Sequence, residues 1–164
     1  MTNDKDEYNK DRIERIFPDY FNQYNIPPEN AREESLEAYR ACKTNRLERE
    51  SFLPSYEENG CQFIEEGEEE DPSTFSLSVY EKPRDVRRFA IVNSTIRPPY
   101  KIAKGRTYPV HGVVLRTREY KQGYKKSSHI DWWLYKDAEP YRDFELIEDF
   151  KQFMEDRKRG ETNE

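Results

Sequence analysis

The chain has 164 residues, a length that suits one domain able to bury a core, and charged residues make up 38% of it. Such a polar composition can accompany disorder, but 12 Tyr, 9 Phe and 2 Trp supply large surfaces for burial. We therefore expect one folded domain over residues 1–164, with frayed ends near 1–5 and 160–164. No run of about 18 apolar residues occurs, which argues against a membrane-spanning helix.

The N-terminus and the cysteines favour a cytoplasmic protein. Residues 1–11 are polar and acidic, unlike a secretory signal peptide. Cys42 and Cys61 have no close spacing, so we expect reduced thiols, with a disulfide between them as the less favoured alternative.

Charge is distributed unevenly along the chain. Residues 1–72 carry 20 acidic and 9 basic side chains, whereas residues 82–126 carry 13 basic and 2 acidic ones. The second segment could therefore present a basic face to an anionic partner. The alternative is that the acidic and basic segments neutralise one another within the fold.

Helices are predicted in the first part of the chain. Ile13, Ile16 and Phe17 have helical spacing within 4–17, and a second helix is expected over 29–49. Residues 57–71 are rich in glutamate, which predicts a solvated acidic loop.

The pattern then changes to strands. Alternating apolar residues predict strands near 74–80 and 129–135, with further strands near 100–103 and 112–116. Pro83 is expected to begin a short helix. A C-terminal helix is predicted from one apolar stripe and ends at Gly160; the stripe consists of Leu146, Ile147, Phe150, Phe153 and Met154. The sequence thus predicts an α+β fold: a small, mostly antiparallel sheet packed with N-terminal helices and a C-terminal helix.

Motifs for cofactors and metals are missing from the sequence. The two histidines, His111 and His129, lie 18 positions apart and away from the cysteines, which is not a zinc pattern. No P-loop, GxGxxG or GxSxG occurs. No cofactor or metal is therefore predicted.

The stretch 127–133 contains the most unusual local composition. If it forms a strand, His129, Asp131, Trp133 and Tyr135 share the face opposite the core stripe, where Asp131 could fix the imidazole tautomer. These four residues are candidate binding residues. The structural alternative is a strand packed under a loop or helix, with Trp132 in the core in either case.

The basic segment 82–126 is interleaved with aromatic residues. Basic side chains neutralise phosphates or acidic protein surfaces, and aromatic faces stack on bases. We expect a non-catalytic interaction module that recognises an anionic partner: an acidic protein first, a nucleotide or nucleic acid second. The candidate contacts in this segment are Arg87, Arg88, Arg97, Lys101, Lys104, Arg106, Arg116 and Arg118.

A second function is suggested by Tyr39-Arg40, by Ser73-Thr74-Phe75-Ser76 before a short helix, and by a late glutamate, Glu145 or Glu148. This order loosely resembles small ADP-ribosyltransferase-like domains. The resemblance implies that Arg40 contacts the phosphates of NAD, that Ser76 supports the nicotinamide end, and that Glu145 or Glu148 polarises the ribose hydroxyl. It requires these groups to converge in one cleft.

Overall fold

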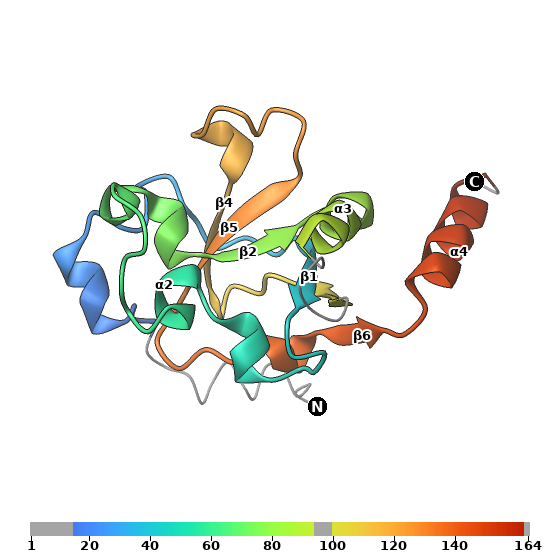
Figure 1. Ribbon diagram of the computed structural model, residues 1–164, viewed down its shortest axis with the longest axis horizontal. Coiled ribbons are helices and arrows are strands. Elements are labelled where there is room, and N and C mark those ends of the chain that lie inside the picture. The colour runs from blue at the N-terminus through green and yellow to red at the C-terminus, as the bar shows by residue number, and fades with distance from the viewer. Residues whose placement is uncertain (1–14, 94–99, 163–164) are drawn as a thin grey trace.

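The computed structural model describes residues 15–93 and 100–162, and its centre is a six-stranded antiparallel sheet (Figure 1). The strand order across the sheet is β4-β5-β2-β1-β3-β6. With helices packed around it, the sheet confirms the predicted small α+β fold. The strands are β1 (Glu37–Cys42), β2 (Leu77–Tyr80), β3 (Lys101–Arg106), β4 (Gly112–Arg116), β5 (His129–Leu134) and β6 (Glu145–Ile147).

Both faces of β5 are buried, because its side chains alternate between two cores. Ile130, Trp132 and Leu134 belong to one cluster, and Trp133, with Tyr135 just after the strand, belongs to another. Strand β5 lies between β4 and β2, and both of its faces are covered. All six of its residues are therefore buried, although one of them is an aspartate.

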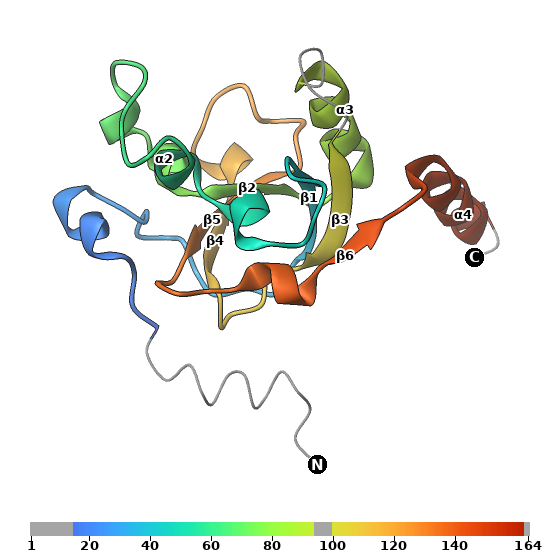
Figure 2. The ribbon, with the colours of Figure 1, turned by 60° about the horizontal axis from the view of Figure 1, so that its bottom comes forward.

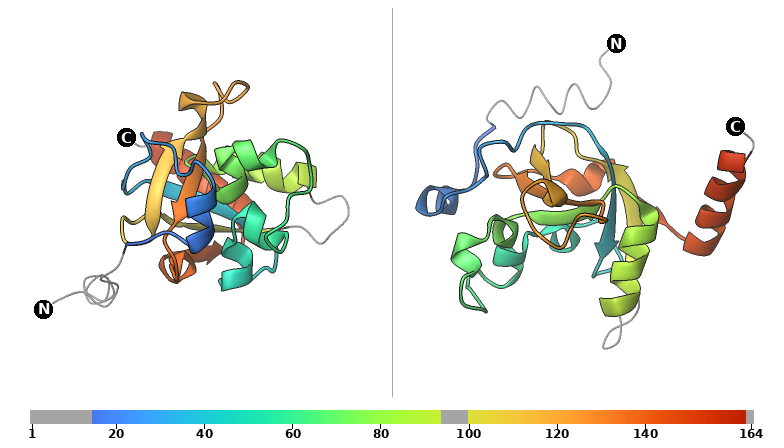
Figure 3. Two further views of the ribbon diagram at one scale, coloured as in Figure 1. Left: turned by 90° about the vertical axis from the view of Figure 1, so that its left-hand side faces the viewer. Right: turned by 90° about the horizontal axis from the view of Figure 1, so that it is seen from above.

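Helices and short 3-10 turns cover the two faces (Figures 2 and 3). On one face, η2 (Arg49–Phe52) and η6 (Pro140–Asp143) close the core around Phe52 and Trp132. On the other, α3 (Pro83–Asn93) covers β1, while η1 (Asp19–Gln23), α2 (Ser55–Glu58) and η4 (Pro72–Phe75) cover β4 and β5.

The predicted helix over 29–49 is wrong. Its centre is β1, which pairs with β2 and β3 in the middle of the sheet. Leu36, Ala38 and Cys42 pack on one face of the sheet, and Tyr39 and Ala41 pack on the other. Burial on both faces removes the alternation that usually identifies a strand.

The C-terminal helix is shorter at its start than predicted. Leu146 and Ile147 lie in β6, and the helix α4 begins only at Phe150 and runs through Gly160 to Thr162. Phe150 and Phe153 pack on the α3 side of the sheet. The residues of the predicted stripe contact two cores: Leu146 packs against the cluster around Phe52, whereas Ile147, Phe150 and Phe153 pack against the cluster beside α3.

The other predicted strands are present in the structure, but they begin and end at slightly different residues. The segment 74–80 divides into η4 and β2, so Phe75 packs on the opposite face from Leu77. Pro83 is the first residue of α3, as predicted. Most of the helix predicted over 4–17, and both predicted frayed ends except 160–162, lie outside the described residues.

The acidic loop predicted over 57–71 contains the end of α2 and the turn η3 (Glu68–Glu70). Cys61 lies in it and is exposed, whereas Cys42 is buried and neither cysteine forms a disulfide. Burial raises the pKa of the Cys42 thiol to about 11. Among the described residues no helix is both long and apolar enough to cross a bilayer.

Candidate functional site

The basic residues of the segment 82–126 divide into two sets. The first lies on strands and has polar partners: Lys101 Nζ lies 2.9 Å from Glu148, Lys104 Nζ lies 3.5 Å from Glu37, and Arg116 Nε lies 2.7 Å from Glu81. Arg106 donates to the Ser35 hydroxyl and carbonyl, each at 3.1 Å. We call these four residues the paired set. Acidic side chains from distant segments pair with three of the four, whereas Arg106 has the neutral Ser35 as its partner.

The second set lies on α3 and on the β4–β5 connection, residues 117–128, but does not include Arg84 and Lys121 of these elements, which form ion pairs with Asp85 and Asp71. Its members are exposed and form no ion pair within residues 15–93 and 100–162. We call them the unpaired set: Arg87, Arg88, Arg118, Lys125 and Lys126. Arg97 lies outside the described residues. The predicted basic segment is therefore not one continuous face.

A groove of about 360 Å³ separates α3 from the β4–β5 connection. Figure 2 shows α3 and the β4–β5 connection, drawn in pale orange, both extending toward the top of the view. Two members of the unpaired set, Arg88 and Lys126, line it. The other lining residues are Tyr80, Asp85, Phe89, Val92, Asn93, Gly123 and Ser127.

Hydrogen bonds fix the two walls of the groove at its base. The Asp85 carboxylate on α3 accepts from the backbone N–H and the hydroxyl of Ser128, at 3.0 and 2.7 Å. Lys82 N–H donates to the same hydroxyl at 3.0 Å. Gly123 takes a φ of 87° and so permits the turn predicted at the tip of the connection. The groove is thus preformed at its closed end.

A buried polar network lies beside the groove, centred on Asp131 of β5. Its carboxylate accepts hydrogen bonds from Ser76 at 2.6 Å, from Thr117 at 2.8 Å and from Tyr120 at 2.5 Å. Burial and the neighbouring Asp131 charge raise the pKa of Tyr120, which keeps its hydroxyl a donor. Three donors satisfy the buried carboxylate without a basic partner.

The same network sets the tautomer of His129. Because Thr117 donates to Asp131, its oxygen accepts from Nδ1–H of His129, and the lone pair then lies on Nε2. Nε2 has no hydrogen bond among the described residues and is not a fully buried atom. Burial lowers the pKa of His129, so the ring is neutral at pH 7. Asp131 therefore acts on the His129 ring indirectly, through the hydroxyl of Thr117, and not by a direct hydrogen bond as predicted.

Aromatic rings surround this imidazole. The Tyr80 ring lies 5.2 Å from the His129 ring in an edge-on arrangement, and the Tyr124 ring lies at 5.4 Å. Tyr80 pairs with His129 across β2 and β5, and with Tyr39 across β2 and β1. The row Tyr39, Tyr80 and His129 thus crosses three central strands beside the groove.

Trp133 and Tyr135 are not available as surface contacts. Trp133 is completely buried and donates its Nε1–H to the Pro72 carbonyl at 2.9 Å. Tyr135 is 8% exposed, and its hydroxyl donates to Glu33 at 2.8 Å. They share a face with His129 and Asp131, as predicted, but η1, α2 and η4 cover that part of it. Trp132 is in the core, as expected.

The groups implied by the transferase resemblance lie on other elements than predicted and point in different directions, since Arg40 lies on a strand and not in a helix. Arg40 lies on β1 and faces the core around Phe52, where it donates to the Ser51 and Ser78 carbonyls at 3.0 and 2.9 Å. Ser76 faces Asp131 on the other side of the sheet. Glu145 lies on the edge strand β6, two strands beyond β1. They line none of the cavities described here together.

Sequence reasoning missed several residues of the groove and its network. Thr117, Tyr120 and Ser128 come from turns, and Tyr80 and Asp85 come from elements that were predicted without a role. The only available signal was local: a histidine and an aspartate two positions apart on a strand require polar partners once that strand is buried.

Comparison with family models, with curated proteins and with solved structures finds no match to this chain.

Proposed function

We propose that this protein is an interaction module that binds an anionic partner in the groove between α3 and the β4–β5 connection. The observation that carries the proposal is the unpaired set, which gathers on these two elements while the paired set is neutralised elsewhere. Cations without partners on a preformed groove attract anions and lose little conformational freedom in the surrounding backbone on binding.

An acidic protein segment is the first candidate for this partner. Arg88 of α3 and Lys126 of the connection both line the groove, and Phe89 and Val92 add apolar surface to its lining. A glutamate or aspartate side chain could reach both cations, while apolar neighbours of that residue pack against α3. A nucleotide or nucleic acid is the second candidate, since Tyr80 and Phe89 offer ring faces for bases.

Fluorescence anisotropy with labelled probes tests the proposal. The probes are an acidic peptide rich in glutamate and apolar residues, a single-stranded oligonucleotide, and a basic peptide as a control. We expect the acidic peptide to bind in low salt and to weaken as salt rises, because exposed charges are screened. Equal binding of the basic peptide, or no binding of any anionic probe, would contradict the proposal.

An ADP-ribosyltransferase-like, NAD-using enzyme is the second candidate function. Only the chain order of β1, β2 and α3 favours it, because Arg40 and Ser76 lie on opposite faces of the sheet and do not meet Glu145 in one cleft. In this case NAD would occupy the same groove, and its phosphates would contact Arg88 and Lys126.

Calorimetric titration with NAD separates the two candidates. Saturable binding of NAD that persists in high salt, together with slow release of nicotinamide, would favour the enzyme. Binding of the acidic peptide without any response to NAD would favour the interaction module. A cytoplasmic location stays a prediction in both cases.

A further inference from the structure

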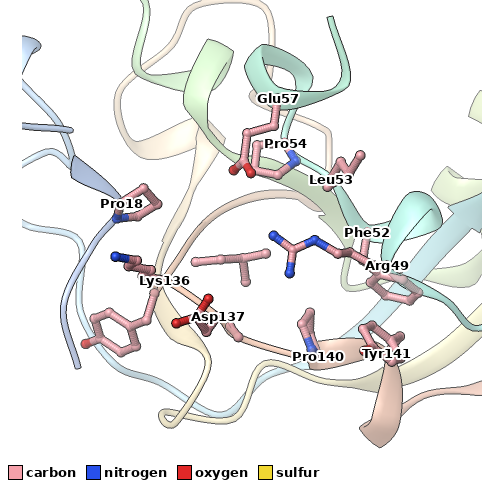
Figure 4. Close-up of a pocket in the computed structure, with 13 residues that line it drawn as sticks. Pro18, Arg49, Phe52, Leu53, Pro54, Glu57, Lys136, Asp137, Pro140 and Tyr141 are labelled. Carbon is pink, nitrogen blue, oxygen red and sulfur yellow. The ribbon is translucent and has the colours of Figure 1, made fainter. Parts of the chain in front are cut away.

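A second cavity, of about 190 Å³, lies at the other end of β5 from the groove (Figure 4). Residues 49–57 form one wall and residues 134–141 form the other, with Pro18 at the edge. Its apolar lining includes Phe52, Leu134 and Tyr141, which extend the main core toward the surface. The backbone of the second wall is fixed by Lys136 N–H, which donates to the Ile16 carbonyl at 2.8 Å.

Four charged side chains surround this cavity: Arg49, Glu57, Lys136 and Asp137. Figure 4 shows the Arg49 guanidinium pointing into the middle of it, with the Glu57 carboxylate above and the Asp137 carboxylate below. None of the four forms an ion pair within the described ranges 15–93 and 100–162. The polar contact that Glu57 makes is a hydrogen bond from the Tyr20 hydroxyl at 2.9 Å.

Opposite charges that surround one cavity without pairing are suited to a ligand that carries both signs. Each would otherwise gain from an ion pair with its neighbour, if only modestly at a surface. A purely anionic ligand would face the two carboxylates, and a purely cationic ligand would face the two basic side chains. Either arrangement is unfavourable because like charges repel. The volume also limits the ligand: it equals that of roughly six water molecules and lies below the range of drug-sized pockets.

We propose that this cavity binds a free α-amino acid with an apolar side chain. The carboxylate of the ligand pairs with the planar fork of Arg49, which suits a carboxylate better than a lysine does. The ammonium group of the ligand pairs with the Asp137 carboxylate, on the other side of the cavity from Glu57. The side chain of the ligand packs against Phe52, Leu134 and Tyr141. This site is independent of the groove and of the function proposed for it.

Isothermal titration calorimetry of the full chain with L-leucine tests this proposal. We expect saturable binding of one leucine per chain. N-acetyl-leucine, which lacks the ammonium group, and leucinamide, which lacks the carboxylate, should each bind at least about tenfold more weakly, because each loses charge-assisted hydrogen bonds. Equal binding of leucine and both derivatives would overturn the proposal.

Two single variants test the location of the site, and two further variants serve as controls. Arg49→Gln and Asp137→Asn should each weaken leucine binding about tenfold or more. Arg46→Gln removes an exposed arginine that does not line the cavity, and it should leave binding unchanged. The double variant Arg88→Gln/Lys126→Gln should also leave it unchanged, since those residues line the groove.

Two results would overturn the inference. One is the absence of any heat of binding from leucine, valine, isoleucine, methionine and phenylalanine up to about 10 mM. The other is leucine binding that neither Arg49→Gln nor Asp137→Asn alters.

Discussion

The paired and unpaired sets come from one basic segment, yet they differ in what surrounds them. Lys101, Lys104 and Arg116 lie on strands that acidic residues from other parts of the chain approach. Arg88 and Lys126 themselves form no ion pair among the described residues, although Asp85 also lines the groove, where its carboxylate accepts hydrogen bonds from Ser128. A basic stretch in a sequence therefore becomes a binding surface only where the fold keeps acidic side chains away from it.

The largest effect is expected beside the unpaired set, in the Asp131 network. Asp131→Ala leaves the hydroxyls of Ser76, Thr117 and Tyr120 without their acceptor, so we expect a loss of about 3 kcal/mol in the free energy of unfolding. Urea denaturation measures this loss. Asp19→Ala, at an exposed position without a polar partner in the described part of the chain, serves as the control and should unfold like the parent protein. A loss as small as that of the control would show that the network contributes little to stability.

The next test reverses charge in each set. Arg88→Glu/Lys126→Glu should weaken the acidic peptide at least about tenfold, because attraction becomes repulsion on both walls of the groove. Lys101→Glu changes a residue of the paired set and should have little effect on affinity. Anisotropy titrations in low salt compare the two variants. If Lys101→Glu weakens binding equally, then overall charge and not the groove determines affinity.

The free energy of unfolding should depend on the paired set and not on the unpaired set. Arg116→Met removes the two hydrogen bonds to the part-buried Glu81 and should cost about 1 kcal/mol. Arg88→Met removes no polar contact and should leave the unfolding midpoint unchanged. Chemical denaturation of both variants at one salt concentration makes the comparison. An equal loss in both would mean that the two sets do not differ energetically.

The smallest effect concerns pH. The pKa of His129 is lowered in the fold, so the unfolded chain binds its proton first as the pH decreases. The stability that neutral His129 contributes is present above its unfolded pKa of about 6.5 and is lost below it. Between about pH 7 and pH 5 we therefore expect the parent protein to lose up to about 1 kcal/mol more than His129→Gln does. Parallel pH dependences of the two proteins would contradict a lowered pKa.

The sequence was informative where one face of an element is solvated or a special residue marks its end. Pro83 identified the start of α3, and the alternation around Leu77 and Val79 identified β2. It was misleading for β1, where both faces are buried and the helical and strand periods cannot be separated. The error at Leu146 and Ile147 arose because β6 has only three residues.

Only those features of the candidate site that depend on neighbouring residues in the sequence could be predicted. The spacing of two positions from His129 to Asp131 placed them on one face of a strand, as the structure has them. The groove depends on a contact between Asp85 and Ser128, which are 43 positions apart, and no local pattern reveals such a contact. The pairing of Arg116 with Glu81 is equally non-local, so the sequence could not distinguish the paired set from the unpaired one.

The two thiols have a practical consequence for such measurements. Cys42 is buried with a pKa of about 11, whereas Cys61 is exposed on the acidic loop. Alkylating reagents consume the accessible thiolate, so a maleimide at neutral pH should modify Cys61 and leave Cys42 intact. Neither the groove nor the small cavity is lined by Cys61. The parent chain therefore offers a single attachment point for a fluorophore or an immobilisation tag without any engineered cysteine.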